Sequence, residues 1–264
     1  MPSNDSSFFA WVGFILNNYG SLFLRGTGIT LLVALSGTLI GFVLGLFVAI
    51  LRTIPVGSTD SLLKKIVLKC LSFLLGVYIE VFRGTPMIVQ AMVIYYGSMK
   101  AGFRMEVLFA AVFIVSINTG AYMAEIIRGG IISVDKGQKE AAHAIGMTHW
   151  QSMVHVVLPQ AVRNIMPSIG NEFVVNIKDS SVLNVIAVNE LYFVSKSAAG
   201  TYLRYFEVFF ITACIYLFLT LSITRILRWL EGKMDGKASY TIYGSQSYSK
   251  ASIPLPEGGK AHDA

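Results

Sequence analysis

The sequence predicts an all-α integral membrane protein with five transmembrane helices and a cytoplasmic helical loop between the third and the fourth. Of its 264 residues, 54% are hydrophobic and only 14% are charged, whereas about a quarter of the residues of a soluble domain carry charge. The apolar residues also gather in uncharged runs of 17 to 24 residues, close to the ~20 that span a ~30 Å hydrocarbon core. These runs are Gly28–Leu51, Val107–Ala124 and Val208–Thr224.

Two further spans contain charged residues. The first, Ile66–Met99, is either one long kinked crossing or two short crossings split at Gly84-Thr85-Pro86. The other, Met166–Val188, contains Glu172, Lys178 and Asp179. We therefore expect spans at about 28–51, 66–99, 107–127, 166–190 and 207–227.

The distribution of basic residues favours five crossings with the N-terminus outside and the C-terminus in the cytoplasm. This arrangement places 15 of the 21 Lys and Arg residues inside, five outside, and Lys178 within a span, which agrees with the positive-inside rule. Splitting 66–99 would move the central loop and its four cations outside, so we favour one kinked crossing. Residues 1–25 form an extracytoplasmic segment, with an amphipathic helix expected over Phe8–Leu24, and residues 232–264 a flexible cytoplasmic tail.

The loop at 128–165 carries the signals of two short helices. Asp135 can cap the first helix, with Gln138 three residues later as a capping-box partner. Gly146 suits the position after its end, where the backbone is left-handed. Thr148 and Gln151 repeat the capping-box spacing for the second helix.

The two loop helices differ in their side chains. In the second, apolar residues recur at i, i+3, i+4, i+7 and i+8 and form one stripe, and Pro159 is expected to end it. The stripe consists of Trp150, Met153, Val154, Val157 and Leu158. The first helix has small residues, Ala141, Ala142 and Ala144, beside the charged Lys139 and Glu140. This smooth surface suits either a docking site for another protein or an ordinary structured loop.

Several ordered motifs resemble those of one transporter family. The loop is similar to the EAA loop of membrane subunits of bacterial ABC importers, and the flanking segments resemble the polar amino acid permeases among them. The resemblance runs from about Gly26 to Glu231, and domain 26–231 is expected to be the transmembrane domain. The matching segments are Phe82-Arg83-Gly84-Thr85-Pro86 with Val89-Gln90, Arg128-Gly129-Gly130-Ile131, Glu140-Ala141-Ala142, Gly146, Leu158-Pro159-Gln160-Ala161 and Lys178-Asp179-Ser180-Ser181.

The resemblance implies that Glu140, Ala141, Ala142 and Gly146 couple the chain to separate ATPase subunits. It also implies a second permease subunit, identical or homologous, an extracytoplasmic amino-acid-binding protein, and location in the bacterial plasma membrane. The sequence has no G-x-x-x-x-G-K-[ST] segment, the usual phosphate-binding loop. We therefore expect no cofactor in this chain and no ATPase site of its own, with ATP and Mg²⁺ bound by the partner.

Charged residues inside a membrane indicate a substrate or ion pathway by default. Glu172, Asn176 and Asp179 recur at i, i+4 and i+7 and therefore share one helical face. Lys178 is the residue next to Asp179, so on a helix the two side chains point about 100° apart. An amino acid zwitterion needs both an acceptor and a donor, which these residues supply. The same residues are also typical of ion pairs between helices, and both interpretations stay open. Asn118 in the third span is a further candidate.

Other polar residues suggest local roles. Glu125 and Arg128 are three residues apart, a spacing that favours a local ion pair. Glu80 and Arg83 have the same spacing, and we expect the same kind of pair there. The four histidines form no metal-ligand set, and no catalytic group stands out. The net charge of +6 is explained by membrane topology rather than by nucleic acid. The alternative function is an ion-coupled secondary transporter or channel without an ATPase partner.

Overall fold

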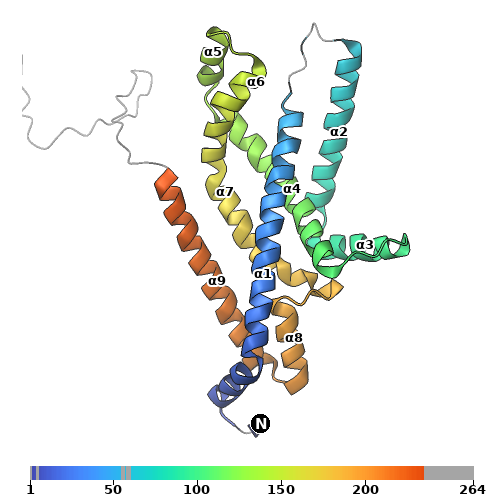
Figure 1. Cartoon of the computed structure of the whole chain (residues 1–264), viewed down its shortest axis with the longest axis vertical. Helices are drawn as coiled ribbons and strands as arrows, with labels where there is room; N and C mark the ends of the chain where they lie inside the picture. The colour runs from blue at the N-terminus through green and yellow to red at the C-terminus, as the bar shows by residue number, and fades with distance from the viewer. Residues whose placement is uncertain (1, 4–5, 55–56, 58–60, 235–264) are drawn as a thin grey trace, which may run out of the picture.

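In the computed structural model, residues 2–3, 6–54, 57 and 61–234 are described, and every regular element among them is helical (Figure 1). By length and apolar composition, three of the helices in this part of the chain could cross a membrane: α1, α4 and α9. The all-helical class is thus confirmed, while the count of five crossings stays a prediction. The helices are α1 (Phe8–Arg52), α2 (Leu62–Gly84), α3 (Met87–Lys100), α4 (Val107–Ser133), α5 (Lys136–Ala144), α6 (His149–Ser152), η1 (Met153–Val157), α7 (Leu158–Asp179), η2 (Ser180–Ile186), α8 (Leu191–Tyr202) and α9 (Tyr205–Met234).

Helix α1 is one helix of 45 residues, about 67 Å long at 1.5 Å per residue. The expected separate helix over Phe8–Leu24 is therefore wrong, because this segment continues directly into the first span. One face of its N-terminal part is packed against the rest of the protein. Trp11, Ile15 and Phe23 are buried, and the last two pack with residues of α8 and α9.

Helices α1 and α4 form the central pair, and three glycines let them approach closely. Gly37, Gly41 and Gly45 lie four residues apart on α1 and face α4. A Cβ added at Gly45 would lie 2.5 Å from Met123 Cβ and 2.8 Å from the backbone nitrogen of Ala124. Small residues at membrane helix interfaces allow such backbone contact. The pair therefore has almost no room for side chains along this line.

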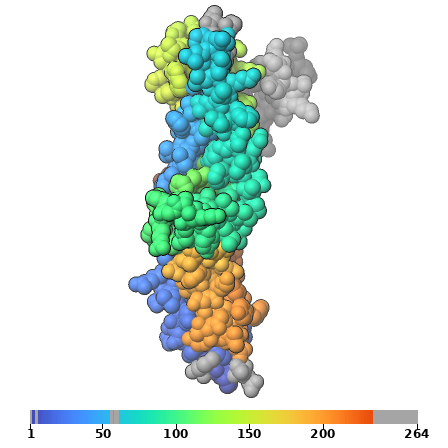
Figure 2. Space-filling model, turned by 90° about the vertical axis from the view of Figure 1, so that its right-hand side faces the viewer, coloured from blue at the N-terminus to red at the C-terminus, as the bar shows by residue number. Residues whose placement is uncertain are grey.

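The expected kinked crossing at 66–99 is two helices in the structure. The chain is extended at Thr85, and Pro86 caps α3. Figure 1 shows α3 lying across the direction of α2 rather than continuing it. In Figure 2, α3 crosses the middle of the visible face between α2 and α8. Arg83 stands in the last turn of α2, at the opposite end of this helix from Lys64 and Lys65.

The loop helix and the fourth span form one continuous path. Helix α6, the π-helical turn η1 and α7 follow one another without a break. Pro159 is the second residue of α7, directly after the π-helical turn η1, and such a local change of hydrogen-bond pattern is a place where a helix accommodates a proline. The prediction that Pro159 ends a helix is therefore wrong. Helix α7 then stops at Asp179, and the 3₁₀ turn η2 continues to Ile186.

The remaining boundaries differ from prediction by a few residues. Helix α4 continues to Ser133, six residues beyond the expected end of the third span. Helix α9 begins at Tyr205 and continues to Met234. The expected tail at 232–264 thus starts inside a helix, and the rest of that prediction lies outside the described residues.

Candidate functional site

The ends of α5 follow from short-range chemistry. Asp135 Oδ1 accepts a 2.7 Å hydrogen bond from the backbone N–H of Gly137. At the other end, Gly146 has φ +83°, and the N–H of Met147 donates to the carbonyl of Ala142 at 3.1 Å. This 6→1 bond together with a left-handed glycine is a Schellman motif. The predicted left-handed backbone of Gly146 after the end of this helix is confirmed, whereas Asp135 caps through Gly137 and not through Gln138.

The second loop helix begins with a capping box at Thr148. Its N–H donates to Gln151 Oε1 at 2.8 Å, and its hydroxyl accepts from the N–H of Gln151 at 3.3 Å. The predicted capping box is confirmed. Both turns of the loop are thus fixed by their own residues.

The loop presents a compact outer surface. Glu140, Ala141 and Gly146 are exposed, and Ile145 is 76% exposed. Ala142, in contrast, is only 4% exposed, so it packs inside the loop rather than on the surface where we expected it. We call the surface formed by Glu140, Ala141, Ile145 and Gly146 the ledge; the basic residues Lys136, Lys139 and His143 are exposed beside it.

The predicted apolar stripe is only partly buried. Met153 and Val157 pack with Val134 and Ala161 at the base of the loop. Trp150 and Val154 are each 51% exposed. The stripe therefore attaches the loop to α4 and α7 on one side only and leaves apolar area beside the ledge.

Asn176 of α7 connects this helix to α1 and α4. It is 3% exposed, and its amide nitrogen donates to the hydroxyl of Thr38 on α1 at 2.8 Å and of Thr119 on α4 at 3.0 Å. A buried amide with partners of this kind stabilises helix packing. The structure therefore places Asn176 in a buried contact between α7, α1 and α4, whereas Glu172 is half-buried and Asp179 is exposed.

Asn118 has a related role at the break between α2 and α3. Its amide donates to Gln90 Oε1 at 2.9 Å. Gln90 in turn donates to the carbonyls of Phe82 and Thr85, each at 2.9 Å. These bonds satisfy backbone carbonyls at the end of α2, which the helix itself leaves without partners. Sequence reasoning missed Gln90, because its partners are visible only once α3 folds back.

Arg83, Tyr122 and the carboxylates of α7 gather on one side of the helix bundle. The guanidinium of Arg83 lies 5.5 Å from the ring centroid of Tyr122. Glu172 is half-buried, within electrostatic range of both Asp179 and Arg83. The expected Arg83–Glu80 pairing is not among the ion pairs of the described residues. This side of the bundle thus holds one guanidinium and two carboxylates, with Glu172 within electrostatic range of the other two groups. Lys178 is exposed on the neighbouring face.

The predicted Glu125–Arg128 pair is confirmed, and Arg52 joins it. Glu125 accepts from Arg128 at 2.9 Å and from Arg52 on α1 at 2.9 Å. All three side chains are part-buried. This cluster ties the ends of α1 and α4 together on the side of the loop.

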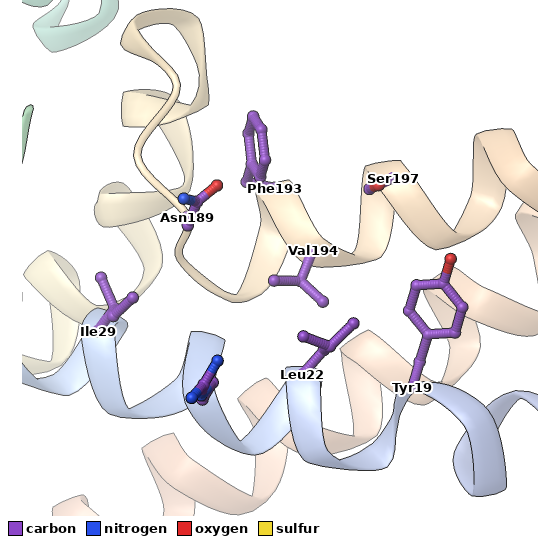
Figure 3. A pocket seen from close by; sticks show the side chains of 8 residues that line it. Tyr19, Leu22, Ile29, Asn189, Phe193, Val194 and Ser197 are labelled. Carbon is purple, nitrogen blue, oxygen red and sulfur yellow. The ribbon is translucent and has the colours of Figure 1, made fainter.

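A groove of about 550 Å³ opens at the other end of the molecule, between α1 and α8. Figure 3 shows Tyr19, Leu22 and Ile29 of α1 opposite Phe193 and Val194 of α8. Arg25 and Asn189 are its polar lining.

A buried carboxylate positions α8, which forms one side of that groove. Glu190 accepts from the N–H groups of Tyr192 and Phe193 at 2.8 and 2.7 Å, and from the hydroxyl of Tyr216 on α9 at 3.1 Å. Glu190 is fully buried. The sequence offered little signal for it, since its partner on α9 is 26 residues away.

Comparisons with known proteins give one consistent result. Residues 67–236 match the family described as binding-protein-dependent transport system inner membrane component. The chain is 36% identical over 215 residues to the glutamine transport system permease protein GlnP of Escherichia coli (strain K12), covering 81% of this chain and 93% of the relative. It is 35% identical over 212 residues to the arginine transport system permease protein ArtQ of Bacillus subtilis (strain 168), covering 80% and 91%.

Solved structures agree. One described as an amino acid ABC transporter with histidines has a TM-score of 0.74 and 37% identity, and the match covers 86% of this chain and 99% of that one. The methionine transporter MetNI, in an inward-facing conformation, has a TM-score of 0.64 at 19% identity, covering 82% of this chain and 96% of that one. The second match shows a shared fold.

Proposed function

Because this chain belongs to the family of binding-protein-dependent transport system inner membrane components, we propose that it carries polar amino acids through the bacterial inner membrane. It is a permease subunit of an ABC importer, and its relatives include glutamine and arginine permeases. These comparisons favour an ABC importer over the ion-coupled secondary transporter or channel. The observation that carries the proposal is this relationship together with the exposed ledge.

In the proposed mechanism, two ATPase subunits close on ATP and move the ledges of two permease subunits. The permease subunits are identical or homologous, and an extracytoplasmic binding protein delivers the amino acid. Hydrolysis, in the ATPase subunits, returns the pathway to its inward-facing state. The N-terminus lies outside and the C-terminus inside, as the basic residues indicate.

The ledge is the proposed contact with the ATPase. Glu140 offers a charge, Ala141 lets a partner approach the helix, and Ile145 supplies exposed apolar area. Gly146 permits the tight turn that holds these residues in place, and Ala142 supports them from within. Aliphatic and charged groups of this kind, set on a rigid turn, are suited to a protein interface.

The ledge can be tested by charge reversal. We expect Glu140→Arg and Ala141→Arg to reduce co-purification of the ATPase and substrate-stimulated ATP hydrolysis at least tenfold, an effect of ~1.4 kcal/mol on coupling. Glu231→Arg on α9 is the matched control, with the same reversal away from the ledge, and should leave both unchanged. Equal ATPase retention in Glu140→Arg and the control would remove the ledge from the mechanism.

The proposed substrate contacts are Arg83 for the carboxylate and Glu172 with Asp179 for the ammonium group. Lys178 is the alternative donor, while Asn176 and Asn118 keep the pathway helices in place. We expect Arg83→Gln and Glu172→Gln to raise the KM for uptake while the ATPase partner stays bound. Lys178→Gln should change KM less, because its side chain points to another face. Unchanged KM in both Arg83→Gln and Glu172→Gln would refute the assignment.

A further inference from the structure

A basic groove lies between the end of α1 and the first half of α2. It has a volume of about 450 Å³ and is lined by Arg52, Lys65, Lys69 and Ser72, with Leu51 and Leu68 beside them. Figure 1 shows this end of α1 and the start of α2 at the same end of the molecule as the ledge. In Figure 2 the surfaces of α1 and α2 lie next to each other on the visible face. The groove is separate from Arg83, Glu172 and Asp179, which belong to the proposed pathway.

The lining carries an excess of positive charge. Lys65 and Lys69 are four residues apart and share one face of α2. Among the described residues, Lys69 makes no ion pair or hydrogen bond. Arg52 is paired with Glu125, but Glu125 also binds Arg128, so this trio keeps one net positive charge. The positive charge that Lys69 and this trio retain attracts an anion, and Lys65 lines the same groove.

The surroundings show which anion fits. The outer surface of α2 is strongly apolar, with Leu62, Leu63 and Phe73 each at least 70% exposed. In a membrane protein such a surface contacts acyl chains. The hydroxyl of Ser72 adds a donor one turn below Lys69. Basic pockets between transmembrane helices at this face of a membrane are typical binding places for anionic head groups.

We propose that this groove binds the phosphate of an anionic phospholipid, whose acyl chains lie along the apolar surface of α2. Arg52 reaches the phosphate from α1, and Lys65 and Lys69 reach it from α2. The bound head group thereby joins two helices that otherwise meet mainly through α4. The chemistry recognised is a phosphate with one net negative charge, and a lipid is its source because the groove opens onto a lipid-facing surface.

The test uses the full-length chain, purified with the subunits it retains and titrated with phosphatidylglycerol or phosphatidylcholine under native mass spectrometry. We expect phosphatidylglycerol to bind preferentially, and Lys65→Gln/Lys69→Gln to weaken it about 30-fold, since each basic residue near such a head group contributes about fivefold. Lys69→Gln alone, a milder change, should weaken it about fivefold. Lys64→Gln is the matched control, with the same loss of charge on a neighbouring residue outside the groove.

Two results would overturn the inference. If Lys64→Gln weakens phosphatidylglycerol as much as Lys65→Gln/Lys69→Gln does, the effect is general surface charge and not a site. In a second arm, inorganic phosphate is added in detergent without lipid. If phosphate alone protects the chain against heat as well as phosphatidylglycerol does, and Lys69→Gln abolishes this protection, the groove holds free phosphate and the lipid assignment is wrong.

Discussion

The close contact between α1 and α4 makes a strong prediction about one glycine. In Gly45→Ala, the new Cβ meets Met123 Cβ at 2.5 Å and two backbone atoms, Ala124 N at 2.8 Å and Met123 C at 2.9 Å. A flexible side chain can move aside, but helix backbone cannot, so the helices must separate. Overpacking costs about 1–3 kcal/mol, and backbone contact places this change near 3. Replacing a helical glycine by alanine returns about 1 kcal/mol, so the net cost is about 2 kcal/mol.

Gly28→Ala provides the matched control. Gly28 lies on the same helix, but a Cβ there meets nothing within 4 Å. Only the propensity gain remains, so this variant should be about 1 kcal/mol more stable than the parent. At about 2–4 °C per kcal/mol for a chain of this size, we expect Gly45→Ala to melt about 4–8 °C lower and Gly28→Ala about 2–4 °C higher.

The assay is thermal unfolding of the purified protein in one detergent, followed by tryptophan fluorescence and by loss of the monodisperse peak after heating. Both variants are measured beside the parent at equal concentration. If Gly45→Ala melts at or above Gly28→Ala, the backbone contact between α1 and α4 is not as tight as the structure has it, and the reasoning fails.

Three further predictions concern the polar contacts and the loop. Asn176→Ala leaves the hydroxyls of Thr38 and Thr119 without their shared donor and should cost about 1–3 kcal/mol, measured as a lower melting temperature; an unchanged value would show that the three helices do not depend on it. Gly146→Ala forces alanine into a left-handed turn at φ +83° and should cost about 1–2 kcal/mol, seen as faster proteolysis between α5 and α6, whereas Gly129→Ala, where a Cβ has open space, should not. Burial, then the cations Lys139 and His143, lower the pKa of His149, so the unfolded loop binds a proton more readily than the folded loop. The stability of the parent relative to His149→Gln should therefore fall as pH drops from 7 through 6.5 and below, and a pH-independent difference would contradict this.

The features that could be predicted from the sequence were those set by near neighbours. The capping box at Thr148 and the left-handed Gly146 involve residues three to five apart, so the sequence contains all the partners. The prediction for Pro159 was wrong because near neighbours leave two possibilities open: a proline marks either the end of one helix or the first turn of the next. Which one applies depends on the π-helical turn before it, and the local pattern does not encode that.

The features that could not be predicted depend on packing between distant segments. Glu172 and Asn176 share a helical face within 40°, yet α1 and α4 cover only one edge of it. Asn176 therefore bonds to Thr38 and Thr119, while Glu172 remains half-exposed. Arg83, in the last turn of α2, comes within electrostatic range of Glu172 through the packing of α2 beside the other helices. Periodicity found the polar residues but did not show which of them would be covered.

The unbroken run of helix from His149 to Asp179 has a mechanical consequence. Its 31 residues extend about 46 Å, from the turn at Thr148, past Glu172, to Asp179. If one end tilts by about 10°, the other end swings by about 8 Å, more than the width of an amino acid backbone. A small tilt of the loop therefore produces a large displacement at the far end of this helical run. Glu172 and Asp179 would move with it, without any further moving part.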